Sequence, residues 1–153
     1  MESTIYCAVR KDFVADQPEE RVRQALITKM TGELGFPKST IGVEKALSQM
    51  PHITSVDVPL RRADIVCFAK GIHPEYDLYP LLLIECKAVP LNAKVLQQVA
   101  GYNLYMKAPF VCVANLSEVK TGWLDRKSGN YQYIDTLPSY EKLLKAVVAS
   151  GNA

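Results

Sequence analysis

The chain has 153 residues, of which 48% are apolar and 22% are charged, and its formal net charge is +2. This length suits a single domain over residues 1–153 with a core of its own, and the ordinary composition excludes a disordered or fibrous chain. The small positive charge excludes the strong overall basicity that marks many nucleic-acid-binding proteins, so charge alone identifies no partner.

Three features of the sequence bear on the compartment. No apolar run approaches the roughly 18 residues of a membrane span, and the N-terminus lacks the charged start and apolar core of an export signal. The four cysteines show no C-x-x-C spacing, and three of them sit in apolar runs, where a free thiol behaves as a small apolar side chain. We therefore expect a cytoplasmic protein with no membrane partner, no disulfide and no zinc site.

A first helix is expected to begin near Pro18 and to end before Gly35, because apolar residues recur at every fourth position between them. Glu19 falls on the apolar side of this helix, whereas Glu20 is turned about 100° away. We therefore expect Glu19 to face inward. Asp16 stands three residues before Glu19, which is the spacing of a capping box, so helix capping is an alternative role for Glu19.

Two strands rich in aliphatic residues are expected over 61–69 and 81–88. Asp64 lies near the start of the first, and Glu85 and Lys87 lie at the end of the second. The turn residues between the strands favour an antiparallel pair. In such a pair the numbers of opposed residues have a constant sum, and an odd sum puts all three charged side chains on one face. An even sum would put Asp64 on the other face.

The remaining segments complete the expected fold. We predict a short edge strand or arm over 5–14, a strand near 41–43, a helix over 93–106, a strand over 109–115, a hairpin over 123–134 and a final helix capped by Ser139. His52 and His73 lie in turn-like segments without a paired ligand spacing, so we expect them to be exposed. This order predicts an α/β fold with a central mixed β-sheet flanked by α-helices and with a C-terminal hairpin and helix.

Two carboxylates and a lysine at one end of a strand pair are a recognisable chemical unit. Carboxylate oxygens suit Mg²⁺ or Mn²⁺, which stabilises charge on a phosphoryl group and lowers the pKa of a bound water. A neighbouring lysine can orient that water or neutralise charge, so the unit predicts phosphodiester hydrolysis. The E-x-K triplet alone carries no weight, because Glu118–Lys120 has the same spacing without a buried strand before it. An ion pair between Glu85 and Lys87 at the rim of the sheet is the structural alternative.

Four segments in this order resemble the PD-(D/E)XK nuclease superfamily: Glu19 on the first helix, Asp64 opening a strand, Glu85–Lys87 closing the next, and Gln98–Tyr102 on the following helix. The chain is most similar to small proteins like the N-terminal nuclease domain of type I restriction enzyme R subunits, in which a Q-x-x-x-Y element accompanies the acids. The resemblance spans roughly residues 5–115. It implies a restriction-endonuclease-like core and a Mg²⁺-dependent deoxyribonuclease, with Mn²⁺ as the alternative ion.

The resemblance also implies roles for individual residues. Three groups would bind the metal ion: Asp64, Glu85 and the main-chain carbonyl of Cys86. Four more side chains would serve the reaction: Lys87 as the catalytic lysine, Glu19 as an auxiliary acid, and Gln98 and Tyr102 in positioning the substrate or the lysine. Glu20 is the alternative to Glu19 as the auxiliary acid. Ala63 stands where a proline often precedes the aspartate, and because that proline is commonly absent in the superfamily, the difference removes little support.

DNA is the substrate that the resemblance implies. No helicase-like segment follows the nuclease-like core, so we expect the chain to reach DNA alone, as a homodimer, or through a restriction-system or helicase partner. A non-catalytic DNA- or partner-binding module of the same fold is the alternative function. Eight cations either form a basic face around the site or are scattered and solvated: Arg10, Lys11, Arg21, Arg23, Arg61, Arg62, Lys94 and Lys107.

Overall fold

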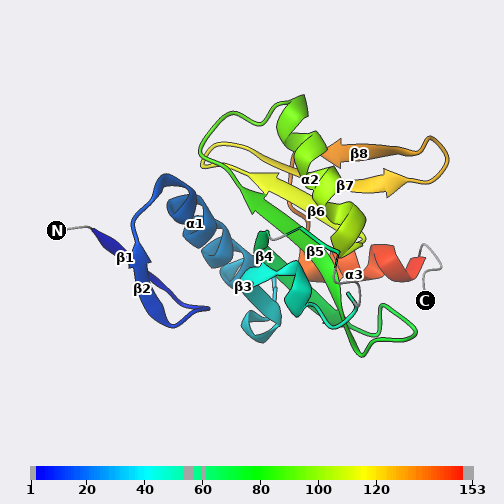
Figure 1. The fold of residues 1–153 in the computed structure, drawn as a ribbon, viewed down its shortest axis with the longest axis horizontal. Helices are drawn as coiled ribbons and strands as arrows, with labels where there is room; N and C mark the ends of the chain where they lie inside the picture. The colour runs from blue at the N-terminus through cyan, green and yellow to red at the C-terminus, as the bar shows by residue number, and fades with distance from the viewer. Residues whose placement is uncertain (1–2, 54–56, 60, 150–153) are drawn as a thin grey trace.

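A six-stranded mixed β-sheet lies at the centre of the computed structural model, which describes residues 3–53, 57–59 and 61–149 (Figure 1). Its strands, in spatial order, are β3 (Ile41–Ala46), β4 (Arg62–Lys70), β5 (Leu78–Cys86), β6 (Phe110–Ala114), β7 (Val119–Asp125) and β8 (Asn130–Ile134). β5 and β6 run parallel, and the other neighbouring strands run antiparallel. β5 is buried over nearly its whole length, which explains its almost continuous aliphatic sequence.

Helices cover both faces of this sheet. α1 (Pro18–Gly32) and α3 (Tyr140–Ala149) pack on one face, and α2 (Ala93–Met106) packs on the other (Figure 1). Two short 3-10 turns, Lys38–Thr40 and Leu47–Gln49, flank β3. Each face has its own cluster of buried apolar side chains. The expected α/β fold with a mixed sheet, flanking helices and a C-terminal hairpin and helix is therefore confirmed.

Two of the helices begin at side-chain caps. The side chain of Asn92 accepts a hydrogen bond from the N–H of Val95 (3.0 Å) at the start of α2. The hydroxyl of Ser139 accepts one from the N–H of Lys142 (3.2 Å) at the start of α3. Such caps satisfy N–H groups that have no partner within a helix. The bounds expected for α2 and the cap expected at Ser139 are confirmed.

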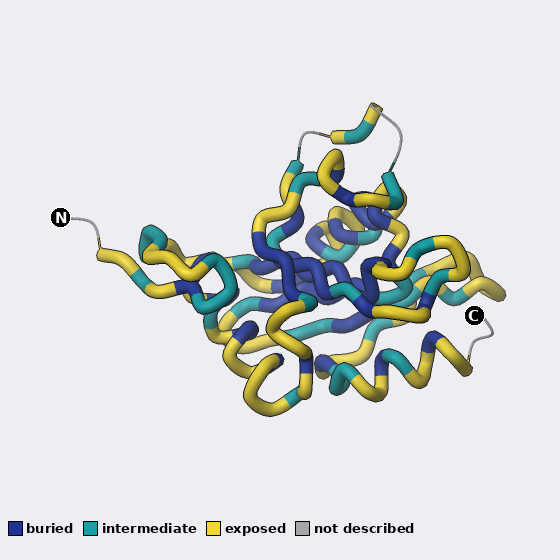
Figure 2. The backbone as a smooth tube through the Cα atoms, turned by 90° about the horizontal axis from the view of Figure 1, so that it is seen from below, coloured by how far each residue is buried: buried dark blue, intermediate teal, exposed yellow. Residues whose placement is uncertain are grey.

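A separate two-stranded hairpin, β1 (Thr4–Cys7) and β2 (Asp12–Ala15), precedes α1. Figure 2 shows it at the left of the molecule, beside the main sheet, with its residues exposed or intermediate except for buried Cys7. The sequence predicted at most one short strand or an arm here, so the hairpin corrects that expectation. At its turn the N–H of Lys11 donates to the carbonyl of Cys7 (2.7 Å). The turn brings Arg10 against acids of α1 and β3.

The register of β4 and β5 decides which of their side chains meet. Ile65 lies opposite Ile84, so the numbers of opposed residues have an odd sum at this end of the pair. Continued by one residue, the same register sets Asp64 opposite Glu85. The odd register that the sequence interpretation requires is therefore confirmed at the end where the acids lie.

A β-bulge between Cys67 and Phe68 changes the register farther along this pair. Beyond the bulge Phe68 lies opposite Pro80, and Leu81 has no opposed residue in β4. Leu81 packs with the cluster on the α1 face, whereas Leu83 packs on the α2 face. The strict alternation of faces along β5 therefore ends at the bulge.

Candidate active site

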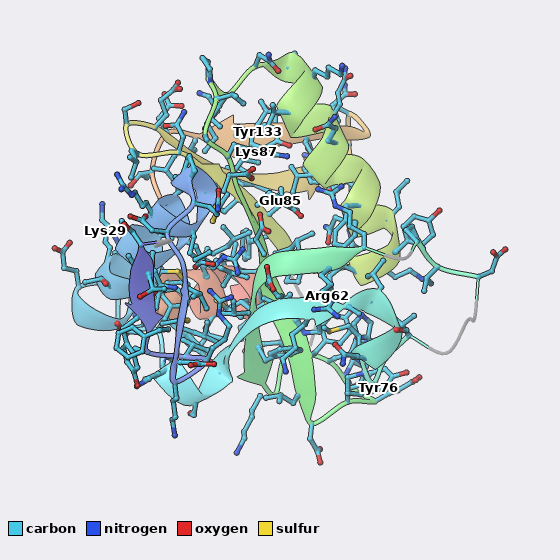
Figure 3. All side chains as sticks on the ribbon, turned by 60° about the vertical axis from the view of Figure 1, so that its left-hand side comes forward. Lys29, Arg62, Tyr76, Glu85, Lys87 and Tyr133 are labelled. Atoms are coloured by element: carbon cyan, nitrogen blue, oxygen red, sulfur yellow. The ribbon has the colours of Figure 1, made fainter. Side chains whose placement is uncertain are left out.

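Asp64 and Glu85 are brought together by the neighbouring strands β4 and β5. Oδ2 of Asp64 accepts a hydrogen bond from the main-chain N–H of Cys86 (2.8 Å), which ties the acid of β4 to the end of β5. Figure 3 shows Glu85 and Lys87 at the same end of that strand. The fold thus joins two carboxylates that the sequence predicted to meet, from positions 21 residues apart in the chain.

Glu85 is held in an unusual environment for an acid. Its side chain is only 5% exposed, and its Oε2 lies 3.2 Å from Nη2 of Arg61. Its Oε1 is buried and has no hydrogen-bond partner among the residues that the structure describes. Burial, followed by the negative charge of Asp64, raises the pKa of Glu85 to about 8. A buried oxygen without a partner is costly in a purely structural site, so it marks a position suited to a cation.

Arg61 connects Glu85 to helix α2. Its guanidinium carbon lies 4.9 Å from the centre of the Tyr102 ring, and the Tyr102 hydroxyl donates to the main-chain carbonyl of Arg61 (3.1 Å). Burial, followed by the charge of Glu85, raises the pKa of Tyr102 to about 12. The hydroxyl therefore remains a donor near neutral pH. Tyr102 faces the site as expected, but it contacts the carboxylates through Arg61.

Lys87 follows the last residue of β5 and is partly exposed. Its main-chain N–H donates to the carbonyl of Ala114 (2.8 Å), which fixes its backbone against β6. The residue lines an open cavity of about 530 Å³ between the start of α1 and the loop 115–118. Among the described residues no ion pair joins Lys87 to Glu85, whose partner is Arg61. The alternative of a salt bridge at the sheet rim is therefore wrong.

Helix α1 turns Glu20, not Glu19, toward the sheet. Glu19 is exposed, whereas Glu20 is only 8% exposed. The buried side of α1 is wider than the fourfold apolar spacing indicated, because Arg23 and Ile27, on the same side as Glu20, are buried too. The expectation that Glu19 faces inward is wrong. Its alternative role in a capping box is wrong as well, since the helix is capped at Gln17 without a side-chain hydrogen bond.

Arg23 links α1 to the acids of the sheet. Its side chain is 6% exposed, and its guanidinium lies 3.7 Å from Glu20, 3.3 Å from Glu44 and 3.7 Å from Asp64. Burial alone would raise the pKa of Glu20, but its contact with Arg10 and the charge of Arg23 lower that pKa below its ordinary value. The arginines thus keep this side of the site ionised, in contrast to Glu85.

The other predicted site residues are less closely engaged. Gln98 lies one turn before Tyr102 on α2, but its side chain is exposed and makes no hydrogen bond within the described part of the chain. Of the eight cations, Arg10, Arg23 and Arg61 lie beside acids of the site. The charge here is therefore mixed rather than uniformly basic.

Sequence reasoning left Glu20 as the alternative to Glu19 for the auxiliary acid and assigned no role to Glu44. The i, i+3 spacing of Glu20 and Arg23 was the one local signal that this acid is paired. Glu44 has no comparable signal, because its partners Arg10 and Arg23 come from other elements.

The donor set fits a hard divalent cation. Asp64 and Glu85 supply the carboxylate oxygens that Mg²⁺ and Mn²⁺ prefer. Within the described residues, no three His, Cys, Asp or Glu side chains gather into a metal-binding group. An ion held by these two acids would therefore take its other oxygens from the main chain, water or substrate, and the Cys86 carbonyl is the predicted main-chain ligand.

A family model described as the type I restriction enzyme R protein N terminus (HSDR_N) matches residues 18–138. The chain belongs to this family. The matched segment contains every strand of the central sheet, together with Asp64, Glu85 and Lys87. No curated protein and no solved structure matches the chain. Among its described residues, no helix combines the length and the apolar character needed to cross a bilayer.

Proposed function

We propose that the chain is a metal-dependent deoxyribonuclease of the PD-(D/E)XK superfamily, which hydrolyses DNA phosphodiester bonds with Mg²⁺ or Mn²⁺ in a restriction system. One observation carries the proposal. The odd register sets Asp64 beside Glu85, and Oε1 of Glu85 is buried without a hydrogen-bond partner among the described residues. The R-protein family supports the same chemical class.

Asp64 and Glu85 would hold the ion, with the main-chain carbonyl of Cys86 as a third ligand. Such an ion, when bound, stabilises charge on the phosphoryl group and lowers the pKa of a water molecule. The N–H of Cys86 already fixes one oxygen of Asp64 and so orients this carboxylate. Glu85 has no comparable hydrogen bond on Oε1 among the described residues, so this oxygen would gain most from the ion.

Lys87 is the proposed catalytic lysine. It is partly exposed and lines an open cavity, so its ammonium can meet a phosphate group that approaches Glu85 from solvent. There it would orient the attacking water and neutralise charge that develops on the phosphoryl oxygens. In this hydrolysis the water oxygen bonds to phosphorus, and the ester oxygen that leaves takes up a proton.

The remaining side chains would act by positioning. Tyr102 holds Arg61 through its ring and its hydroxyl, and Arg61 in turn holds Glu85. Gln98 would contact DNA from the exposed side of α2. The auxiliary role that the sequence assigned to Glu19 passes in this proposal to Glu20, which is buried beside Arg23.

A cleavage assay with Mg²⁺ and with Mn²⁺ tests the proposal. We expect the wild-type protein to nick or degrade DNA, and Lys87→Ala and Asp64→Asn to lower the rate by roughly 100-fold or more. Circular dichroism and thermal unfolding check that both variants are folded. Lys70→Ala is the matched control, because Lys70 is an exposed lysine at the other end of β4, and it should keep full activity.

Inactive wild-type protein on single-stranded, duplex and branched DNA with both ions would overturn the nuclease proposal. The non-catalytic DNA- or partner-binding module would then stand as the function. Calorimetric titration with Mg²⁺ tests whether the two acids bind a metal ion or are only paired with arginines. If they bind the ion, wild-type protein gives a heat of binding that Asp64→Asn removes; if they do not, neither protein gives one.

The proposed activity also indicates the partners. DNA is the proposed substrate. A second copy of the chain, or a restriction-system or helicase protein, is the proposed partner that brings the site to DNA. An activity on cellular or invading DNA belongs in the cytoplasm, where we place it.

A further inference from the structure

Arg10 and Arg23 meet beside Asp64, where the turn of the β1–β2 hairpin touches α1. Nη2 of Arg10 lies 2.6 Å from one oxygen of Glu20, and Nη1 of Arg23 lies 3.7 Å from the other oxygen of the same carboxylate. Nη2 of Arg23 also lies 3.7 Å from Oδ1 of Asp64. The guanidinium of Arg23 thus adjoins an acid of the proposed metal site, and that of Arg10 shares the Glu20 carboxylate with it.

These guanidinium groups have more donors than the fold satisfies. Nε of Arg10, and Nε and Nη1 of Arg23, are buried and have no hydrogen-bond partner among the described residues. Arginine is always charged and cannot relieve such a deficit by losing its proton. Because unmet donors on a buried cation are costly, their excess points to an anionic ligand with several acceptor oxygens.

Glu44 covers the two arginines from the solvent side. Its Oε1 lies 3.3 Å from Nη2 of Arg23 and its Oε2 lies 3.9 Å from Nη1 of Arg10, while its own side chain is 43% exposed. These are long contacts for ion pairs. Nη2 of Arg23 thus donates one long hydrogen bond to Glu44, whereas Nε of Arg10 and Nε and Nη1 of Arg23 stay without a partner among the described residues.

Two features favour the departure of Glu44 from this position. Its φ of 54° lies in the left-handed region, which costs a non-glycine residue on the order of 1 kcal/mol. Val43 lies opposite Ile65 and Lys45 opposite Ala63, so the register sets Glu44 across from Asp64, a residue of like charge. A rearrangement of the backbone at Glu44 as its side chain leaves the arginines would relieve both the strain and the repulsion.

We infer that Arg10 and Arg23 form a binding site for a phosphate group, and that the carboxylate of Glu44 occupies this site until the phosphate displaces it. The inference rests on the proposed function, because it assigns the site to a phosphate of the same DNA strand that Asp64 and Glu85 act on. A phosphate offers more acceptor oxygens than a carboxylate and matches two guanidinium forks. Glu44 then turns into the solvent that it already meets.

DNA binding in EDTA tests the inference without any need for catalysis. The probe is a short fluorescein-labelled DNA duplex, followed by anisotropy over a series of NaCl concentrations. Glu44→Gln keeps the size of the side chain but removes its charge, so we expect roughly tenfold tighter binding. We also expect the slope of log K against log salt to steepen by about 0.9, the value for one further phosphate contact.

Two further variants serve as controls. Glu75→Gln removes the charge of an exposed glutamate in the β4–β5 connection, so it measures the general effect of one negative charge and should leave the salt slope unchanged. The double variant Arg10→Gln with Glu44→Gln should lose the tighter binding. Sodium phosphate, compared with NaCl of equal ionic strength, distinguishes the source of the ligand: competition assigns the site to free phosphate as well, and its absence assigns it to the DNA diester.

The inference fails if folded Glu44→Gln binds DNA no more tightly than Glu75→Gln, or if Arg10→Gln leaves the gain intact. Parallel cleavage assays separate this failure from that of the proposed function. Active wild-type protein without a gain in Glu44→Gln would overturn the phosphate site alone. Inactive wild-type protein with the gain would overturn the nuclease proposal and keep the phosphate site.

Discussion

At one end of the β4–β5 pair, Asp64 and Glu85 place carboxylates among arginines, and at the other end four rings pack together. Figure 3 shows Glu85 toward one end of this strand pair and Tyr76 toward the other end. Both ends remove polar groups from water. They differ in whether those groups find partners.

At the ring end the polar atoms are satisfied. His73 stacks on Tyr79 with ring centres 4.6 Å apart, and the Tyr79 hydroxyl donates to the carbonyl of Lys107 (2.8 Å). Nε2 of His52 donates to the carbonyl of Met106 (2.7 Å). Both histidines are partly buried, so the expectation that they are exposed is wrong. Tyr76 of the β4–β5 connection and Tyr79 of β5 pack against them, which the local sequence of the histidines does not indicate.

The acid end keeps its polar atoms unsatisfied. Oε1 of Glu85, Nε of Arg10 and Nε of Arg23 are all buried without a hydrogen-bond partner among the described residues. A fold stabilises itself by pairing such atoms, as it does around Tyr79. The ring end therefore stabilises the fold, whereas the acid end leaves buried polar atoms unpaired, as the proposed function requires of a site that binds a ligand.

The largest expected effect concerns Glu85. Its pKa is raised from 4.5 to about 8, so the folded state holds a proton that the unfolded state has lost. The contribution of Glu85 to stability is therefore most favourable below about pH 4.5 and is lost as the pH rises toward 8. Glu85→Gln should remove this loss and stabilise the metal-free protein at high pH by on the order of 2–4 kcal/mol.

Urea unfolding of metal-free protein near pH 5 and pH 8.5 measures this difference. Glu75→Gln is the control, since this glutamate is exposed, and it should show no such gain. An equal stability of wild type and Glu85→Gln at both pH values would contradict the contrast between the two ends. The same variant should lose metal-dependent cleavage, which would separate stability from function at one residue.

A smaller effect is expected at the ring end. Tyr79→Phe removes the hydrogen bond to Lys107 and keeps the ring stack, so it should cost about 1 kcal/mol. Burial raises the pKa of Tyr79 above its ordinary value of 10, so the cost should not change between acid and neutral pH. Cleavage should be unaffected. A Tyr79→Phe protein with impaired cleavage would break the division between a structural end and a functional end.

The smallest effect concerns His52, and its sign is opposite to that of Glu85. Burial lowers the pKa of His52 below 6.5, so the fold favours the neutral ring, and the contribution of this residue to stability is lost as the pH drops below about 6.5. Because the ring is partly exposed, the loss should stay under about 1 kcal/mol. His52→Gln should remove it, as thermal unfolding near pH 5.5 and 7.5 would measure. A difference in stability between wild type and His52→Gln that is the same at both pH values would contradict this assignment.

Local sequence predicted the secondary structure well. The 93–106 helix, the cap at Ser139 and the two long strands follow from signals within a few residues of each element. The sequence could also predict the pairing of Asp64 with Glu85. If the two strands form an antiparallel pair, only an odd or an even register is possible, and the odd register puts both acids on one face. The β-bulge after Cys67 could not be predicted in this way. It does not change the pairing of the acids, because it lies farther along the two strands.

By itself, then, the sequence determined the α/β order of elements and the two acids and lysine that end on neighbouring strands, because periodicity and turn chemistry act over short distances. Only the tertiary structure decided that Glu20 rather than Glu19 faces inward, that Arg61 rather than Lys87 pairs with Glu85, and that Glu44 lies over two arginines. Those outcomes depend on which elements pack together. Charged side chains from distant segments form pairs according to how close and how buried the fold makes them, and no local sequence pattern contains this information.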